Sequence, residues 1–232
     1  MTDHEELDQS PYDEEETARQ VAGLVDLLPD RRCRVLDIGC GDGRIAGPLL
    51  ASAGHDRIEL VGVDRDRSVE SGFHETSGGA AAFRIGDLRQ ADSLPDGPFD
   101  LVLVLGNLLM TVREPRVLRE CLRGIAERTT AGGALVVDDF AEGGWAELAA
   151  GRWADGIDES GLVQMVWLPG DPEFVVRMGD DVDPSSTTPR PDERVLRLWS
   201  RRELDDAAEG VGLVRATHLP GHLLSVHRRL EP

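Results

Sequence analysis

The chain has 232 residues, a length that fits one large domain or a core of about 150–200 residues with an insertion. Hydrophobic residues make up 40% of it, enough for a buried core, but no apolar run approaches the roughly 20 residues of a membrane span. The formal net charge of −19 argues against a nucleic-acid partner, because binding a phosphate backbone needs a basic surface. The acidic amino terminus has no signal-peptide features, so we expect a cytoplasmic protein with no membrane association.

Arginine supplies all 25 positive charges, since the sequence contains no lysine. This excludes a lysine base, a Schiff-base lysine and the lysine of a P-loop. Arginine in place of lysine, with abundant Ala, Gly, Asp and Glu, is typical of a high-GC bacterial genome. Cys33, Cys40 and Cys121 show neither C-x-x-C spacing nor an even number, so we expect reduced thiols and no cysteine metal site.

In chain order, residues 1–16 carry eight acidic side chains. Apolar residues then recur at helical spacing, which predicts a helix over residues 14–28 that stops at Pro29. Tyr12, the only tyrosine, lies just before this helix.

The stretch VLDIGCGDGR, residues 35–44, reads as a strand, a glycine turn and the start of a helix. Its glycines, Gly39, Gly41 and Gly43, fall on alternate positions, where the backbone turns tightly and no Cβ blocks a ligand. Taken alone, the stretch also fits an ordinary tight turn between a strand and a helix. Two details narrow the choice: the spacing is not the G-x-G-x-x-G of nicotinamide or flavin sites, and Asp37 lies two residues before the first glycine.

Residues 37–43 match D/E-x-G-x-G-x-G, so the chain resembles the class I S-adenosylmethionine-dependent methyltransferases. The resemblance implies an α/β fold with a seven-stranded, mostly parallel Rossmann-like sheet of order 3-2-1-4-5-7-6. Its last strand would be antiparallel, and helices would cover both faces. It also implies S-adenosylmethionine as the methyl donor and S-adenosylhomocysteine as the product.

Further acidic residues follow the next two predicted strands. Residues 58–63 form a strand that ends at Asp64, 21 residues after Gly43, where a carboxylate binds ribose hydroxyls in dinucleotide folds. In the resembled family the same position holds the ribose, and Asp66 is more consistent with a helix cap. After the strand over residues 80–85, Asp87 and Leu88 match the family's adenine-binding pair, although an Asp here also suits a turn.

A continuous apolar run after Phe99 predicts a central parallel strand, which ends at Leu105-Gly106-Asn107, where the family's fourth motif lies. The resemblance thus implies a cofactor site made of Asp37, Gly39, Cys40, Gly41, Gly43, Asp64, Arg65, Asp87, Leu88 and Leu105, with Tyr12 closing over it.

An amphipathic helix over residues 116–126 leads to a strand over 134–137, which ends in Asp138 and Asp139. At the carboxyl end of a strand these carboxylates would line the ligand crevice. They could bind a cationic amine, accept a proton or help to hold a divalent metal. The candidate catalytic residues are Asn107, Asp138, Asp139 and His222.

Residues 141–200 break the alternation of strands and helices. Residues 162–168 and 174–178 predict paired short strands, followed by a polar loop and a strand over 195–199. The four tryptophans, Trp145, Trp153, Trp167 and Trp199, all fall here. The segment resembles the insertion that many small-molecule methyltransferases use as a substrate cover or dimer contact, so a homodimer is among the expectations.

The chain closes with a helix over residues 201–209, capped by Ser200, and strands over 213–219 and 222–228. His222 and His227 are more consistent with structural or surface residues, and His222 is the better candidate for titration. The expected division is a cap helix (1–30), a cofactor-binding core (31–140), an insertion (141–200) and a final helix and hairpin (201–232).

These patterns predict methyl transfer to a small-molecule acceptor, an amine rather than a hydroxyl, and the cap and insertion resemble glycine and aminosugar N-methyltransferases. A metal-dependent O-methyltransferase that uses Asp138, Asp139 and Asn107 is the alternative, although the prediction itself includes no metal site. A cofactor-binding protein without catalysis and a nicotinamide-dependent oxidoreductase are the other classes.

Overall fold

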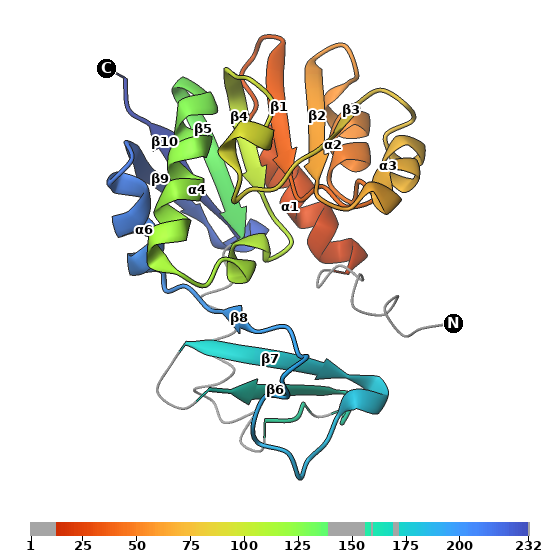
Figure 1. Cartoon of the computed structure of the whole chain (residues 1–232). Coiled ribbons are helices and arrows are strands. Elements are labelled where there is room, and N and C mark those ends of the chain that lie inside the picture. Colours follow the sequence, from red (N-terminus) through yellow and green to blue (C-terminus); the bar gives the residue numbers. More distant parts are fainter. Residues whose placement is uncertain (1–12, 139–155, 159, 169–171, 232) are drawn as a thin grey trace.

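The computed structural model describes residues 13–138, 156–158, 160–168 and 172–231. Two sheets organise these residues (Figure 1). The large sheet contains β1 (Cys33–Ile38), β2 (Ile58–Asp64), β3 (Ala82–Ile85), β4 (Phe99–Val104), β5 (Thr129–Asp138), β9 (Leu213–Leu219) and β10 (Leu224–Arg229). Its spatial order is β3-β2-β1-β4-β5-β10-β9, with β10 antiparallel to both neighbours. The predicted order, with its antiparallel last strand, is confirmed.

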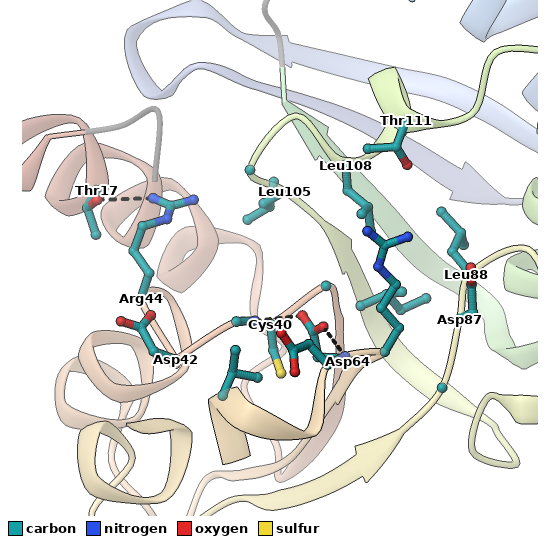
Figure 2. A pocket seen from close by; sticks show the side chains of 18 of the residues that line it. Thr17, Cys40, Asp42, Arg44, Asp64, Asp87, Leu88, Leu105, Leu108 and Thr111 are labelled. Atoms are coloured by element: carbon teal, nitrogen blue, oxygen red, sulfur yellow. Dashed lines mark hydrogen bonds between the residues drawn. The ribbon is translucent and has the colours of Figure 1, made fainter. Parts of the chain in front are cut away.

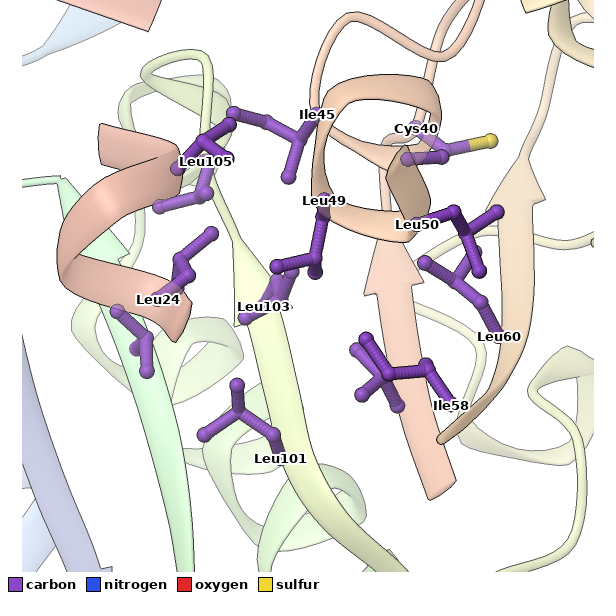
Figure 3. Packing of buried hydrophobic residues seen from close by; sticks show 14 of the residues in the cluster. Leu24, Cys40, Ile45, Leu49, Leu50, Ile58, Leu60, Leu101, Leu103 and Leu105 are labelled. Atoms are coloured by element: carbon purple, nitrogen blue, oxygen red, sulfur yellow. The ribbon is translucent and has the colours of Figure 1, made fainter. Parts of the chain in front are cut away.

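Helices cover both faces of this sheet. One face carries α1 (Glu14–Leu27), α2 (Ala46–Ala53) and α3 (Glu70–Thr76), and the other carries α4 (Pro115–Arg128) and α6 (Arg201–Glu209). Successive residues of a strand point to opposite faces, so β4 packs Leu103 toward the first group and Val104 toward the second. Figure 3 shows Leu24 of α1 and Leu49 of α2 packed in the cluster that contains Leu103. Burial on both faces explains why the strand reads as an unbroken apolar run.

Local chemistry explains where the helices begin. Asp13 accepts a hydrogen bond from the Glu16 amide while the Glu16 carboxylate accepts one from the Asp13 amide, which is a capping box at α1. Ser200 and Glu203 form the same arrangement at α6, which confirms Ser200 as the predicted cap. Pro115 opens α4, where its missing amide hydrogen leaves no helical bond unmade.

The insertion contributes a three-stranded sheet of β6 (Val163–Trp167), β7 (Glu173–Met178) and β8 (Leu196–Arg197). The predicted pair of strands is confirmed as an antiparallel ladder between β6 and β7. This sheet lies beyond the end of the large sheet at which β5 stops (Figure 1). Trp145 and Trp153 lie outside the described residues, and the expected division into four segments stays a prediction.

Several predicted boundaries differ from the structure by a few residues, among them those of β10 and β5. His222 belongs to the 3₁₀ turn Pro220–His222, and β10 begins only at Leu224, because Leu223 has a left-handed backbone with φ of 55°. A residue in that conformation cannot continue a strand. Strand β5 begins five residues before the predicted Ala134, with an irregularity in its pairing to β4.

Candidate active site

A cavity of about 860 Å³ lies where β1, β2 and β4 end, within the roughly 300–1,000 Å³ range of ligand pockets (Figure 2). Five parts of the chain form its walls: the start of α1, the glycine loop, the end of β2, residues 86–89 and residues 105–112. Arg194, from the insertion, also lines it. Segments far apart in the sequence therefore meet at the carboxyl edge of the sheet, as the α/β fold requires of a ligand site.

Most of the predicted cofactor residues line this cavity: Gly39, Cys40, Gly41, Asp64, Arg65, Asp87, Leu88 and Leu105. Asp37 and Gly43 lie in the same loop but are not among the lining residues. Tyr12 lies outside the described residues.

The glycine loop is fixed by backbone geometry. Gly39 has φ of 74°, and a Cβ there would lie 2.7 Å from Cδ2 of Leu108. A side chain is therefore excluded both by the backbone conformation and by the opposite wall of the cavity. The amides of Gly39 and Cys40 both donate to the Val63 carbonyl, at 2.7 and 3.1 Å, so the loop is anchored to the end of β2.

Asp64 connects the glycine loop to the turn after β2. Its Oδ2 accepts a hydrogen bond from the Gly41 amide at 3.1 Å, and its Oδ1 accepts one from the Asp66 amide at 2.9 Å (Figure 2). Asp66 in turn accepts a hydrogen bond from the Ser68 amide and caps the 3₁₀ turn Arg67–Val69. The expectation that Asp66 is a cap is confirmed.

Asp87 is paired with a cation that the sequence reasoning missed. Arg89 donates to it from Nη2 at 2.8 Å, from Nε at 3.0 Å and from its amide at 2.9 Å. The hydrogen bonds from the Arg89 side chain lower the pKa of Asp87, so its carboxylate is held ionised in the cavity wall. The bond to the amide two residues on is the turn geometry expected as the alternative for this Asp. One side chain therefore serves the turn and also faces the cavity.

Asp37 is buried behind the glycine loop, with 3% of its surface exposed. Burial raises its pKa from 3.8 to about 7. Arg44 acts against this shift, whereas the negative charges of Asp64 and Asp138 add to it. The motif carboxylate thus titrates near neutral pH, and any cation brought close to it would favour its ionised form.

Arg44 is the second cation that the sequence reasoning missed. Its Nη1 donates to Thr17 Oγ1 at 3.0 Å (Figure 2). The same nitrogen donates to Gln20 Oε1 at 2.9 Å, so Arg44 ties the glycine loop to α1. Two signals point to these residues in the sequence. Arg44 directly follows the last glycine of the motif, and Gln20 is a polar residue flanked by the apolar helix positions Ala18 and Val21.

Asn107 and Asp138 do not line the large cavity. They lie at a separate cavity of about 40 Å³, with His227 and Asp205. The backbone of Asn107 is left-handed, with φ of 57°, and its amide donates to Asp138 Oδ2 at 2.6 Å. Gln20 Nε2 donates to the other oxygen of Asp138 at 3.1 Å. Asp138 therefore holds backbone and side chain in place with both carboxylate oxygens.

The histidines are placed away from the large cavity. His222 Nδ1 lies 2.8 Å from the carbonyl oxygen of Arg19, so its ring packs on α1 and lines neither cavity. His227 is buried with Nε2 3.0 Å from Asp205 Oδ1. Burial lowers the pKa of His227 despite the opposing effect of Asp205. The described part of the chain thus brings no histidine into the lining of the large cavity.

Within the described residues, no group of three or more His, Cys, Asp or Glu side chains could hold a metal ion. Asp139, which the metal-dependent alternative requires, lies outside them. The lining instead combines apolar side chains (Ile38, Val69, Leu88, Leu105 and Leu108) with carboxylates and arginines. Such a mixture fits a ligand with a flat apolar ring, hydroxyl groups and a charged end.

Residues 35–133 match the family model described as a methyltransferase domain. This part of the chain is similar to a methyltransferase domain, and its strand order is that of the Rossmann-like methyltransferase fold. The match spans the glycine motif, β1 to β4 and the start of β5, so it includes most of the cavity walls. The matched segment thus brings together the glycine motif and the strand ends that form the large cavity.

Solved structures of methyltransferases share the fold. The CcbJ methyltransferase of Streptomyces caelestis has a TM-score of 0.65 and 19% sequence identity over 95% of this chain and 98% of its own. CalS10 of Micromonospora echinaspora, an amino pentose methyltransferase solved with S-adenosylmethionine, has a TM-score of 0.61 and 19% identity over 99% of this chain and 97% of its own. An O-methyltransferase family protein of Burkholderia thailandensis has a TM-score of 0.59 and 16% identity, over 92% of this chain and 57% of its own.

At these identities the similarity is one of fold. No curated protein matches the sequence. None of the described helices has the length and apolar character needed to cross a bilayer.

Proposed function

We propose that this chain is an S-adenosylmethionine-dependent methyltransferase that transfers the methyl group to an amine of a small molecule. The observation that carries the proposal is the set of titratable groups in the described lining of the large cavity. They are carboxylates, arginines and one buried thiol, Cys40, whose pKa burial raises further. Histidine is absent from that described lining, and the whole sequence lacks lysine.

The donor's place in the cavity follows from the chemistry of the walls. Asp64 would accept hydrogen bonds from the ribose hydroxyls, and Asp87 with the Leu88 amide would meet the adenine edge. Apolar walls formed by Leu88 and Leu105 suit the adenine faces, and Arg44 and Asp37 lie toward the charged end. The open space at Gly41, where a Cβ would meet nothing within 4 Å, leaves room for close approach of a ligand.

When bound, S-adenosylmethionine supplies a methyl group on a positively charged sulfur. The residues of this chain hold donor and acceptor in line and exclude water. Orientation of this kind can lower the activation barrier by several kcal/mol. The apolar segment at residues 105–112 suits the region around the sulfur, because a fixed anion there would stabilise the charged ground state more than the transition state.

An amine and a hydroxyl make different demands on the chain. A neutral amine reacts through its own lone pair and needs a proton acceptor only after methyl transfer. A hydroxyl needs a base within hydrogen-bond reach before the transfer. The carboxylates of Asp13, Glu14 and Asp42 line the cavity, where their negative charge favours an acceptor that carries an amine, and the proton released after methyl transfer can pass to water.

The decisive experiment uses matched acceptors. The enzyme with S-adenosylmethionine is offered pairs of small molecules that differ only in carrying an amine or a hydroxyl at one position, such as amino sugars and their parent sugars. Formation of S-adenosylhomocysteine and the mass of the product are measured. We expect methylation of the amine members, with rates that rise with pH as the amine loses its proton.

Methylation of the hydroxyl members alone would overturn the proposal. Loss of that activity with a chelator, restored by a divalent metal, would instead establish the metal-dependent O-methyltransferase. Tight binding of the donor with no turnover on either set would point to a cofactor-binding protein without catalysis.

A further inference from the structure

Three segments that line or support the large cavity meet at one buried amide. Gln20, on α1, is 0% exposed. Its Oε1 accepts a hydrogen bond from Arg44 of the glycine loop at 2.9 Å, and its Nε2 donates to Asp138 at the end of β5 at 3.1 Å. Asp138 then accepts the Asn107 amide at 2.6 Å. The relay Arg44–Gln20–Asp138–Asn107 thus runs from the glycine loop through α1 to the turn after β4.

This relay joins opposite walls of the cavity. On one side, Arg44 lines the cavity and also holds Thr17 of α1, another lining residue. On the other side, the Asn107 amide sits at the start of the 3₁₀ turn Leu108–Thr111, which supplies Leu108 and Thr111 to the lining. The left-handed backbone of Asn107 is strained for a residue with a side chain, so it needs fixed partners to persist.

From this geometry we infer that Gln20 is a positioning residue, which couples the α1 and glycine-loop wall to the wall at residues 105–112. A carboxamide suits the task because it accepts from the Arg44 cation and donates to the Asp138 carboxylate at the same time. An apolar side chain can neither accept from Arg44 nor donate to Asp138. A cationic side chain can only donate, and an anionic one can only accept. Gln20 therefore acts on methyl transfer through Arg44 and Asp138, without touching either reactant. The inference rests on the proposed placement of the donor in this cavity.

The test compares two variants, Gln20→Glu and Gln20→Leu. Hydrogen–deuterium exchange measures the opening of residues 105–112, and calorimetry measures the affinity for S-adenosylhomocysteine. In Gln20→Glu the introduced carboxylate faces Asp138 at the distance of a hydrogen bond. At pH 5.5 one shared proton preserves the bridge, whereas at pH 8.5 two negative charges repel each other. Arg44 and Asp138 face this position directly, Asp37 lies near Arg44, and His222 packs on the same helix at Arg19.

We expect Gln20→Glu to match the wild-type protein at pH 5.5. At pH 8.5 it should exchange about tenfold faster in residues 105–112 and bind S-adenosylhomocysteine about tenfold more weakly. All values are compared with the wild-type protein at the same pH, which removes the intrinsic pH dependence of exchange. Gln20→Leu should show the faster exchange at both pH values.

Gln164→Leu is the matched control. It removes a second buried glutamine, 3% exposed, which joins β6 to Asp183 in the loop between β7 and β8 and takes no part in the relay. Its exchange in residues 105–112 should equal that of the wild-type protein.

Two results would overturn the inference. One is unchanged exchange of residues 105–112 in Gln20→Leu. The other is an effect of Gln20→Glu that is the same at pH 5.5 and 8.5, which would indicate a packing role alone. If Gln20→Leu does not fold, the nearly isosteric Gln20→Glu still gives the pH comparison. If the donor binds elsewhere, the exchange changes remain while the affinity for S-adenosylhomocysteine does not move, so failure of the donor's placement is distinguishable.

Discussion

At the scale of single residues, Asp37 couples stability to pH in an unusual direction. A carboxyl whose pKa rises from 3.8 in the unfolded chain to about 7 in the fold binds more protons when folded. The free energy of unfolding therefore falls as pH rises from about 4 to about 7, and it stays low above that range. The ionised form is disfavoured because burial removes its water, and Arg44 only partly offsets this.

We expect Asp37→Asn to stabilise the ligand-free protein at pH 8.5, by an amount on the order of 2–4 kcal/mol, and to leave stability at pH 4.5 nearly unchanged. Urea unfolding at pH 4.5, 6.5 and 8.5 measures this. Asp42→Asn, which removes an exposed carboxylate from the same loop, should retain the wild-type pH dependence. Parallel pH curves for wild type and Asp37→Asn would contradict the assignment.

The proposed ribose contact at Asp64 gives a second prediction. Asp64→Ala removes the proposed charged hydrogen bonds to the ribose and also the anchor of the Gly41 amide. We expect the affinity for S-adenosylhomocysteine to fall by about 1–3 kcal/mol, measured by calorimetry. Asp66→Asn, which keeps the cap acceptor two residues along, should change it by less than about twofold. Unchanged affinity in Asp64→Ala would remove the ribose assignment.

How far the sequence predicts this site depends on how local the cause is. The positions of Gly39, Asp64 and Asp87 follow from strand ends and turn conformations, which short stretches of sequence encode. The relay does not, because Gln20 and Asp138 are 118 residues apart and meet only when α1 packs on the sheet. The same packing gives both carboxylate oxygens of Asp138 hydrogen-bond partners that its place at a strand end did not predict, and its candidate role as a base stays a prediction. The prediction of a strand at His222 is wrong because the left-handed backbone of Leu223 has no sequence signal when the residue is not glycine.

At the scale of elements, the loop between β7 and β8 is organised by one buried cation. Arg177 has 1% of its side chain exposed and donates to Glu193 at 2.5 Å, and also to the carbonyl oxygens of Ser186 and Thr188. Glu193 precedes Arg194, so the clamp also sets the position of the residue that lines the cavity. A polar loop of this length is thus ordered by charge-assisted bonds in place of an apolar core.

Arg177→Met should therefore release this loop. Loss of one partner from a buried ion pair typically costs about 3–5 kcal/mol, since the other charge is left without compensation. We expect new protease cleavage sites within residues 180–193, which mass spectrometry identifies. We expect no new cleavage in the strands of the large sheet. Arg190→Met is the control, because that arginine is 40% exposed and its pairing is worth only about 0–1 kcal/mol. In the double variant Arg177→Met/Glu193→Leu, part of the resistance to protease should return, as no lone buried charge remains.

At the scale of the whole molecule, the dominant electrostatic fact is the excess of negative charge. The chain has 44 acidic residues and 25 arginines, so 19 acidic charges have no cation to balance them. Surface ion pairs such as Arg116–Glu120 contribute little individually, whereas the repulsion acts over the entire surface. Salt screens both the ion pairs and the repulsion between like charges. We expect the loss of repulsion to stabilise the fold more than the weakening of the ion pairs destabilises it.

We therefore expect the melting temperature to rise by several degrees between 20 and 300 mM NaCl, as the Debye length shrinks from about 20 Å to about 6 Å. Differential scanning fluorimetry at pH 8 measures it. Choline chloride at equal ionic strength should act in the same way, because screening depends on ionic strength and not on a bound sodium ion. A melting temperature that falls with both salts would mean that attractive pairs, such as Arg177–Glu193 and Arg34–Glu59, outweigh the repulsion. The excess charge would then be spread widely enough to leave the fold undisturbed.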